Sequence, residues 1–145
     1  MKRNIIITGS ECSGKSFLER LITNGEQVIR IKGYRNKKVL RDVSRLLNPD
    51  TEYIVIDDVD QKTLSYLSEL ICIDKIIVDK QGEQRFTIPK PRVILTIPLH
   101  VLDAKEFEPS QMRRLVVINM DTMTIAQLMH FCKDQGIIIN TSPGR

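Results

Sequence analysis

Residues 9–16 read GSECSGKS and follow the apolar run NIIIT at residues 4–8. They match the pattern G-x-x-x-x-G-K-[ST], with Gly9 as its first residue and Ser16 as its last. The apolar run has the composition of a buried strand, and a helix is predicted at residues 15–24. A strand before this pattern and a helix after it form the context in which such a loop binds phosphate. The sequence therefore predicts a phosphate loop at residues 9–16.

The residue types of the phosphate loop suit this chemistry. Gly9 and Gly14 let the backbone turn so that several N–H groups face phosphate oxygens, and the following helix adds the positive end of its dipole. Lys15 is expected to reach the β- and γ-phosphates as a catalytic residue, and the Ser16 hydroxyl to bind Mg²⁺. The alternative is a turn of small residues without a ligand. The predicted nucleotide-binding residues are Gly9, Ser10, Glu11, Cys12, Ser13, Gly14, Lys15 and Ser16, with ATP and Mg²⁺ as cofactors.

Short apolar runs alternate with amphipathic segments along the chain, which predicts an α/β fold. The runs are rich in Ile and Val and nearly continuous, as expected for strands of a mainly parallel sheet buried on both faces. Strands are predicted at residues 4–8, 27–31, 53–57, 92–97 and 115–119. Helices are predicted at residues 15–24, 37–47, 61–71 and 124–135. A β-hairpin is predicted for residues 75–79 and 84–88, which flank QGE. The prediction is one three-layer P-loop NTPase domain over residues 1–145, with five strands, helices on both faces and an inserted hairpin.

Composition narrows the range of functions. The 145 residues carry a formal net charge of +4, and basic side chains cluster at residues 30–41 and 80–92. The three cysteines show no C-x-x-C spacing, so neither a disulfide framework nor a zinc site is predicted. No run is long enough to span a bilayer, and no signal peptide is recognisable, which favours a cytoplasmic protein without a membrane partner.

In the last predicted helix, Ile125, Leu128, Met129 and Cys132 recur at helical spacing and are expected to face the core.

A second chemical motif is the acidic stretch EYIVIDDVD at residues 52–60. A buried strand delivers Asp57 at its carboxyl end, where ligands of open α/β sheets bind. Asp57 is predicted to hold Mg²⁺ together with Ser16, and Asp58 to orient and deprotonate an attacking water. Asp60 is expected to cap the next helix. The alternative is that Asp57 and Asp58 merely begin that helix, because Asp is favoured in first turns.

The order of later elements resembles superfamily 3 helicases, particularly the AAA+-like ATPase domain of replication initiators from small viruses and plasmids. The resemblance covers roughly residues 4–119 and is carried mainly by DKQGEQRFTIPKPRVILTIP at 79–98 and QMRRLVVI at 111–118. In that family the hairpin projects into the channel of a ring and its basic tip grips single-stranded DNA. The resemblance therefore implies that Lys80 contacts DNA, with assistance from Arg85.

The resemblance also implies an arginine finger at Arg113 or Arg114, of which Arg114 is preferred. Supplied by a neighbouring subunit, it would neutralise charge on the γ-phosphate. A homo-oligomeric ring, a hexamer if superfamily 3-like, is implied as well. The alternatives are an ordinary solvated turn at Lys80 and a surface arginine pair without this role.

One position departs from the family. The strand RVILTI should be followed by a polar residue that senses the γ-phosphate, usually Asn, but Pro98 stands there. Proline offers no side-chain donor, so hydrolysis is expected to be slow or to depend on a partner unless Thr96 substitutes. The function predicted is an ATP-hydrolysing motor on single-stranded nucleic acid, expected to be DNA, in phage or mobile-element replication in the host cytoplasm. The alternatives are a small nucleotide or nucleoside kinase and a non-hydrolysing ATP-dependent switch or adaptor.

Overall fold

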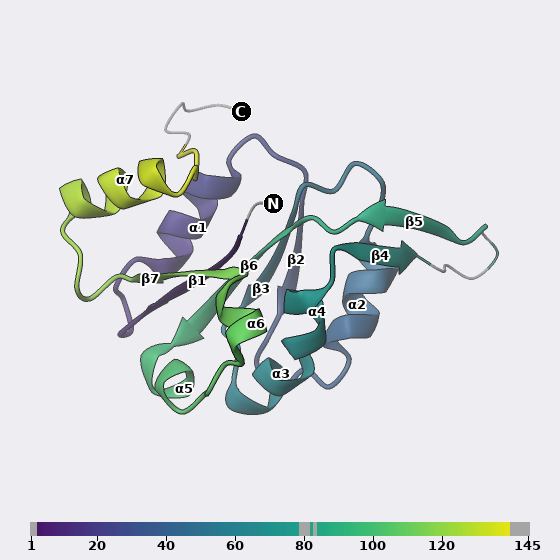
Figure 1. The fold of residues 1–145 in the computed structure, drawn as a ribbon, viewed down its shortest axis with the longest axis horizontal. Coiled ribbons are helices and arrows are strands. Elements are labelled where there is room, and N and C mark those ends of the chain that lie inside the picture. Colours follow the sequence, from purple (N-terminus) through teal and green to yellow (C-terminus); the bar gives the residue numbers. More distant parts are fainter. Residues whose placement is uncertain (1–2, 79–81, 83, 140–145) are drawn as a thin grey trace.

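The predicted strands form one five-stranded sheet in the computed structural model, which describes residues 3–78, 82 and 84–139. The strand order is β2-β3-β6-β1-β7, and every neighbouring pair is parallel. Their carboxyl ends therefore meet along a single edge of the sheet (Figure 1). The strands, each within one residue of its predicted bounds, are β1 (Asn4–Gly9), β2 (Val28–Lys32), β3 (Tyr53–Asp57), β6 (Arg92–Pro98) and β7 (Leu115–Asn119).

Both faces of the sheet are buried against helices. In β1, Ile5 and Ile7 belong to one buried apolar cluster and Ile6 to another, because successive side chains point to opposite faces. Two apolar faces explain why the strands read as continuous Ile- and Val-rich runs. The first face is covered by α1 (Lys15–Thr23) and α7 (Ile125–Asp134), and the second by α2 (Val39–Leu46), α3 (Gln61–Tyr66) and α4 (Ser68–Cys72). The three-layer architecture is thus confirmed.

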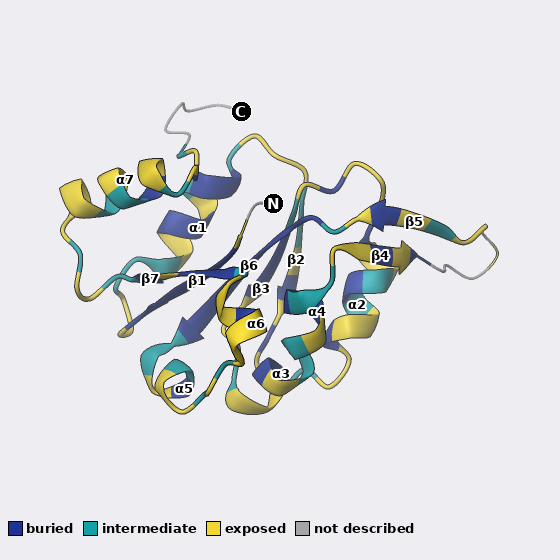
Figure 2. Cartoon of the chain, in the orientation of Figure 1, coloured by how far each residue is buried: buried dark blue, intermediate teal, exposed yellow. Residues whose placement is uncertain are grey.

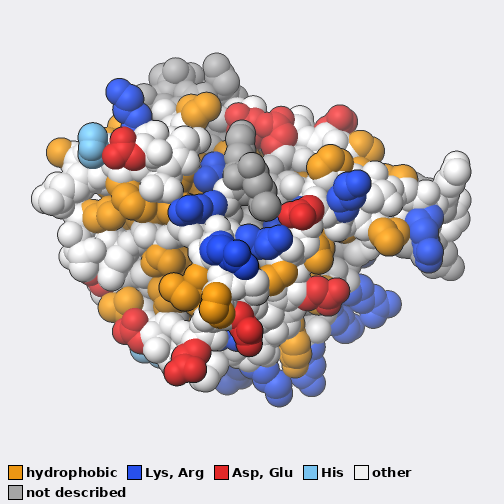
Figure 3. Space-filling view, in the orientation of Figure 1, with side chains coloured by type: hydrophobic (Ala, Val, Ile, Leu, Met, Phe, Trp, Pro, Cys, Tyr) orange, Lys and Arg blue, Asp and Glu red, His pale blue; other side chains and the backbone are white. Residues whose placement is uncertain are grey.

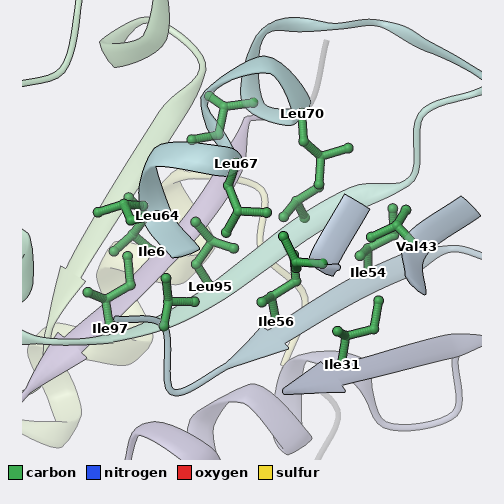
Figure 4. Packing of buried hydrophobic residues seen from close by; sticks show 14 of the residues in the cluster. Ile6, Ile31, Val43, Ile54, Ile56, Leu64, Leu67, Leu70, Leu95 and Ile97 are labelled. Atoms are coloured by element: carbon green, nitrogen blue, oxygen red, sulfur yellow. The ribbon is translucent and has the colours of Figure 1, made fainter. Parts of the chain in front are cut away.

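The larger cluster lies between the sheet and the helices α2, α3 and α4 (Figure 4). Leu64 and Leu67 lie over the strand residues Ile6 and Leu95, and all four side chains are at most 1% exposed. Burying each such side chain contributes about 1.5–3 kcal/mol. This packing fixes β1, β3 and β6 relative to one another and thereby fixes the loops at their carboxyl ends.

The predicted hairpin is also present. Strands β4 (Lys75–Val78) and β5 (Phe86–Pro89) pair antiparallel, with Lys75 opposite Pro89 and Val78 opposite Phe86. The hairpin extends outward beyond α2 and α4 (Figure 1). Its predicted DNA contact, Lys80, lies outside the described residues.

The helices differ from the prediction in two respects. The segment predicted at residues 61–71 is two short helices, α3 and α4, and two further short helices, α5 (Leu99–Asp103) and α6 (Pro109–Met112), were not predicted because neither is long enough to show helical periodicity. A capping box of Glu108 and Gln111, with Pro109 in the first turn, begins α6.

The prediction that the whole apolar stripe of α7 faces the core is wrong. Cys132 is 1% exposed, but Met129 is 44% and Ile125 82% exposed. The helix lies beside the sheet edge formed by β7, so its amino-terminal part covers little of the sheet (Figures 1 and 2). Within the part of the chain that the structure describes, no helix combines the length and apolar character that crossing a membrane requires.

Candidate nucleotide-binding site

The phosphate loop joins the carboxyl end of β1 to the first turn of α1. Three of its residues have left-handed backbone conformations: Gly9 at φ 149°, Cys12 at φ 60° and Gly14 at φ 94°. A Cβ atom on Gly9 would lie 2.6 Å from Ser13 Oγ, so only glycine fits there. The backbone therefore curls tightly around the end of α1, as the motif predicts.

Polar groups of the loop fit an anionic ligand. Lys15 Nζ donates to the carbonyl oxygens of Gly9 at 3.0 Å and Ser10 at 2.9 Å, which holds the ammonium group over the loop. Gly14 occupies the N-cap of α1, and no side chain of the residues that the structure describes caps this end, so first-turn N–H groups remain for a ligand. Ser13 Oγ is buried and has no hydrogen-bond partner among the described residues. Such an arrangement suits a phosphate group.

The acidic residues lie at the same edge of the sheet as the phosphate loop. Asp57 is the last residue of β3, and only β6 separates β3 from β1. Two interstrand spacings amount to about 10 Å, a span that Mg²⁺ with its water ligands and a phosphate would fill. The residues predicted to bind Mg²⁺, Ser16 and Asp57, therefore belong to one side of the molecule.

Thr96, on the intervening strand β6, connects the two acids. Its hydroxyl donates a short hydrogen bond to Asp57 Oδ1 and accepts one from the Asp58 N–H at 2.8 Å. The Val59 N–H donates to the Thr96 carbonyl at 2.9 Å. Asp58 itself is held in a left-handed conformation, at φ 57°, which is strained for a residue other than glycine. Thr96 thus fixes both the carboxylate of Asp57 and the turn that presents Asp58.

Gly33 supports the acids from the other side. Its N–H donates to the Asp57 carbonyl at 2.6 Å, and an added Cβ would lie 2.7 Å from Val59 Cγ2. Asp60 caps α3, as predicted, by accepting from the Thr63 N–H at 2.8 Å, and also accepts from the Arg35 N–H at 2.9 Å. Burial acts to raise the pKa of Asp60, but these hydrogen bonds and the Arg35 charge leave the pKa below its usual value. The loop after β2 is therefore tied to the acidic segment at both ends.

Pro98 ends β6 directly opposite Gly9 of β1. Its side chain and its backbone nitrogen provide no hydrogen-bond donor to a phosphate at this position. Thr96 does not compensate in this geometry, because its hydroxyl is already bonded to Asp57 and Asp58.

The arginine pair lies at the opposite end of the sheet from the phosphate loop. The Asn4 N–H, at the start of β1, donates to the Arg114 carbonyl at 2.8 Å. Arg113 is exposed, whereas Arg114 is partly buried and its Nε has no hydrogen-bond partner among the described residues. Neither arginine is placed to act on the phosphate loop of its own chain, so a role in hydrolysis is open to them only across a subunit boundary.

A cavity of about 1060 Å³ lies beside Arg114 and is also lined by Lys90 and Arg92. Lys90 Nζ donates to the carbonyls of Leu70 at 3.0 Å and Ile71 at 3.3 Å, at the end of α4. Burial lowers the pKa of Lys90 from 10.5 to about 8, with the charge of Asp74 opposing this change and that of Arg114 adding to it.

Asp121 is a residue of the site that sequence reasoning missed. Asp121, in the turn between β7 and α7, accepts from both the N–H and the hydroxyl of Ser10, each at 2.8 Å. No motif marks Asp121. Its position could have been inferred only from the strand order, which places β7 beside β1 and brings the residue after β7 next to the phosphate loop.

No protein-family model matches this sequence. No curated protein sequence matches it significantly. Solved structures do match its fold. A ligand-bound JCV helicase has a TM-score of 0.57 at 16% identity, covering 81% of this chain and 35% of that chain. Another JCV helicase structure gives 0.54 at 14%, covering 94% and 40%.

The apo form of the NrS-1 C-terminal region matches with a TM-score of 0.56 at 14% identity, covering 92% of this chain and 34% of that chain. This chain therefore spans between 34% and 40% of the length of these three matched chains. The predicted P-loop NTPase fold is confirmed, and the resemblance to superfamily 3 helicases is confirmed at the level of the fold.

Proposed function

We propose that this chain is a P-loop ATPase that acts as a helicase-like motor subunit on single-stranded nucleic acid. The observation that carries the proposal is the placement of two chemical motifs at one edge of the sheet. The phosphate loop follows β1, and Asp57 and Asp58 follow β3, with Thr96 of the intervening strand holding both acids. A phosphate cradle beside a fixed pair of carboxylates is the arrangement that ATP hydrolysis requires.

Each residue has a distinct role in this proposal. Lys15 and the N–H groups at the start of α1 hold the β- and γ-phosphates, while Ser16 and Asp57 provide the oxygen ligands for Mg²⁺. When bound, Mg²⁺ neutralises charge on these phosphates. Asp58 is exposed next to this ion site and orients and deprotonates the attacking water.

The surface near the acids supports a nucleic-acid partner. The segment from Lys32 to Arg41 carries five exposed cations, Lys32, Arg35, Lys37, Lys38 and Arg41. Tyr34 is 55% exposed, and the Arg35 guanidinium lies 5.2 Å from the centre of its ring. Basic groups beside an exposed aromatic ring suit single strands, because phosphates bind the cations and bases stack on the ring. Lys and Arg side chains also gather below α2 and α3 and on the hairpin (Figure 3).

The remaining parts of the proposal rest on the resemblance. The β4–β5 hairpin would supply Lys80 and the exposed Arg85 as further contacts to single-stranded DNA. Arg113 or Arg114 would act on the nucleotide of a neighbouring subunit, and their distance from their own phosphate loop agrees with action in trans. A ring of identical subunits working in phage or mobile-element replication, in the host cytoplasm, would combine these features.

Phosphate release tests the proposal directly. We expect Mg²⁺-dependent release from ATP that single-stranded DNA stimulates, with native mass showing an oligomer under the same conditions. Lys15→Ala should abolish nucleotide binding. The control Lys133→Ala removes an exposed lysine of α7, outside the phosphate loop, and should leave nucleotide binding unchanged. Retained affinity in Lys15→Ala would refute the phosphate-loop assignment, and phosphate transfer to a nucleoside without release into water would refute the motor.

A second candidate function, an ATP-dependent switch that does not hydrolyse its nucleotide, is favoured by one observation. Pro98 lies opposite Gly9 without a side-chain donor, and Thr96 is committed to the acids. Tight Mg²⁺–ATP binding without phosphate release, in the presence or absence of DNA, would select this function. Replacing Pro98 by Asn should then introduce measurable release, because Asn adds a side-chain donor at that position.

A further inference from the structure

The two residues that follow β7 lie against the phosphate loop. They are Met120 and Asp121 and are here called the clamp segment. The Met120 N–H donates to the Thr8 carbonyl at 2.8 Å, which extends the β1–β7 ladder to the end of β1. The Met120 side chain lies beside both glycines of the loop, since added Cβ atoms would fall 3.1 Å from Met120 Cβ at Gly9 and 3.5 Å from its Cε at Gly14. The clamp segment therefore contacts both ends of the glycine-bounded turn.

Asp121 is the polar half of this contact. Its two carboxylate oxygens each accept one hydrogen bond from Ser10, from the N–H and from the hydroxyl, both at 2.8 Å. Hydrogen bonds to a carboxylate are among the strong ones, and a paired arrangement fixes orientation as well as distance. Ser10 is thereby held at the point where the chain leaves the strand and enters the loop.

Local structure does not explain the position of this carboxylate. The Asp121 N–H is used within its own turn and donates to Asn119 Oδ1 at 3.0 Å. Helix α7 has a complete cap of its own, because Thr124 and Gln127 form a capping box. The carboxylate of Asp121 is thus directed across to another element, a separation of 111 residues along the chain.

The location is electrostatically adverse for a nucleotide site. A carboxylate beside a loop that binds phosphates repels the ligand. Charge alone would therefore favour a basic or neutral side chain at this position. The benefit must come from the hydrogen bonds. The loop holds three residues with positive φ, one of which is Cys12, and such a backbone persists only where neighbouring contacts enforce it.

We propose that Asp121 is a positioning residue for nucleotide binding. By holding Ser10, it keeps the N–H groups of the phosphate loop turned inward before a nucleotide arrives, so that binding does not have to organise the loop. Lys15 holds the loop through the Gly9 and Ser10 carbonyls, and Asp121 holds it through the N–H and hydroxyl of Ser10. The effect on nucleotide affinity rests on the proposed function, whereas the effect on the loop does not.

Three variants separate the hydrogen bonds from the charge. Asp121→Ala removes both, whereas Asp121→Asn removes the charge but keeps an oxygen for the Ser10 N–H and an amide that can donate to the Ser10 hydroxyl. Asp103→Ala removes an exposed carboxylate from α5 as the matched control. The first measurement is amide hydrogen exchange across residues 10–16 in the nucleotide-free protein. We expect exchange about tenfold faster in Asp121→Ala, and wild-type rates in Asp121→Asn and Asp103→Ala.

The second measurement is the affinity of the same variants for Mg²⁺–ATP, by titration of a fluorescent ATP analogue. Asp121→Ala should bind about tenfold more weakly, with Asp121→Asn close to wild type. If the wild type hydrolyses ATP, KM should rise in Asp121→Ala while kcat stays unchanged, because a preformed loop aids ground and transition states alike. A residue that only stabilises the fold would lower Tm without this division between KM and kcat.

The outcomes are distinguishable. Unchanged exchange in Asp121→Ala overturns the proposal, as does tighter nucleotide binding in both Asp121→Ala and Asp121→Asn, which would show that repulsion dominates. Loss of protection in Asp121→Asn equal to that in Asp121→Ala also overturns it, because charge would then be the cause. Failure of the wild type to bind any nucleotide would refute the proposed function, while the exchange measurement would still decide whether Asp121 holds the loop.

Discussion

Replacing Thr96 by valine removes one hydroxyl from the site and leaves the shape of the side chain almost unchanged. Thr96 is 2% exposed, and its hydroxyl makes hydrogen bonds to the Asp57 carboxylate and the Asp58 N–H. A hydrogen bond to a charged group contributes about 1.5–3 kcal/mol, and an N–H left without a partner costs about 1–3 kcal/mol. Asp57 is exposed, so water weakens the contribution of its hydrogen bond with Thr96. We therefore expect the free energy of unfolding to fall by about 2 kcal/mol.

The same substitution should affect catalysis more than stability. Without the bridge, the left-handed turn at Asp58 is free to relax, and Asp58, the proposed general base, loses its fixed position. General-base catalysis contributes about 10²- to 10⁴-fold, so a displaced base should reduce kcat by roughly 10- to 100-fold. The KM for ATP should change little, because the phosphate loop is untouched.

Two assays check the Thr96 prediction: urea unfolding for stability and Mg²⁺-dependent phosphate release for kcat. Thr96→Ser is the control, because it retains the hydroxyl and loses only a methyl group, at a cost of about 1 kcal/mol. Equal unfolding midpoints and equal kcat in the valine and serine variants would refute the reasoning that the hydroxyl organises the two acids.

Two further predictions concern stability. Ile56→Ala, at a fully buried site, should lower the free energy of unfolding by about 2–5 kcal/mol, whereas Ile125→Ala, at 82% exposure, should change it by less than about 0.5 kcal/mol; urea midpoints compare them directly. Lys90 has a pKa of about 8 when folded and an ordinary pKa of 10.5. The unfolded chain therefore binds more protons between these values, so the contribution of Lys90 to stability should rise with pH from about 8 to 10.5. Lys90→Met should remove this part of the rise, and parallel pH profiles of unfolding for the two proteins would contradict the assignment.

Much of the fold follows from local sequence. The runs at 4–8 and 92–97 carry consecutive apolar residues that face both sides of a strand, as expected in a sheet covered on both sides. The phosphate loop is also predictable, because a short motif encodes its backbone through glycine. The location of the acidic pair at the site is predictable as well, because ligands bind at the carboxyl ends of parallel strands and the pair follows β3.

The remaining features depend on the order of the strands, which the sequence does not state. Asp121 approaches Ser10 only because β7 pairs with β1, and Thr96 reaches Asp57 only because β6 lies next to β3. The prediction for the apolar stripe of α7 is wrong for a related reason. Helical periodicity shows which side chains share a face, but not how much of the sheet lies beneath that face.

The position of the arginines has a consequence for how such an enzyme would behave in a test tube. Arg114 adjoins the start of β1 at Asn4 and the phosphate loop begins at its end at Gly9, five residues away along the strand, or about 17 Å. If the arginine acts in trans as proposed, turnover per molecule must fall on dilution, since isolated chains hold only half of the machinery. Mixing Lys15→Ala chains with Arg114→Ala chains should restore part of the lost turnover, because some junctions then unite an intact phosphate loop with an intact arginine.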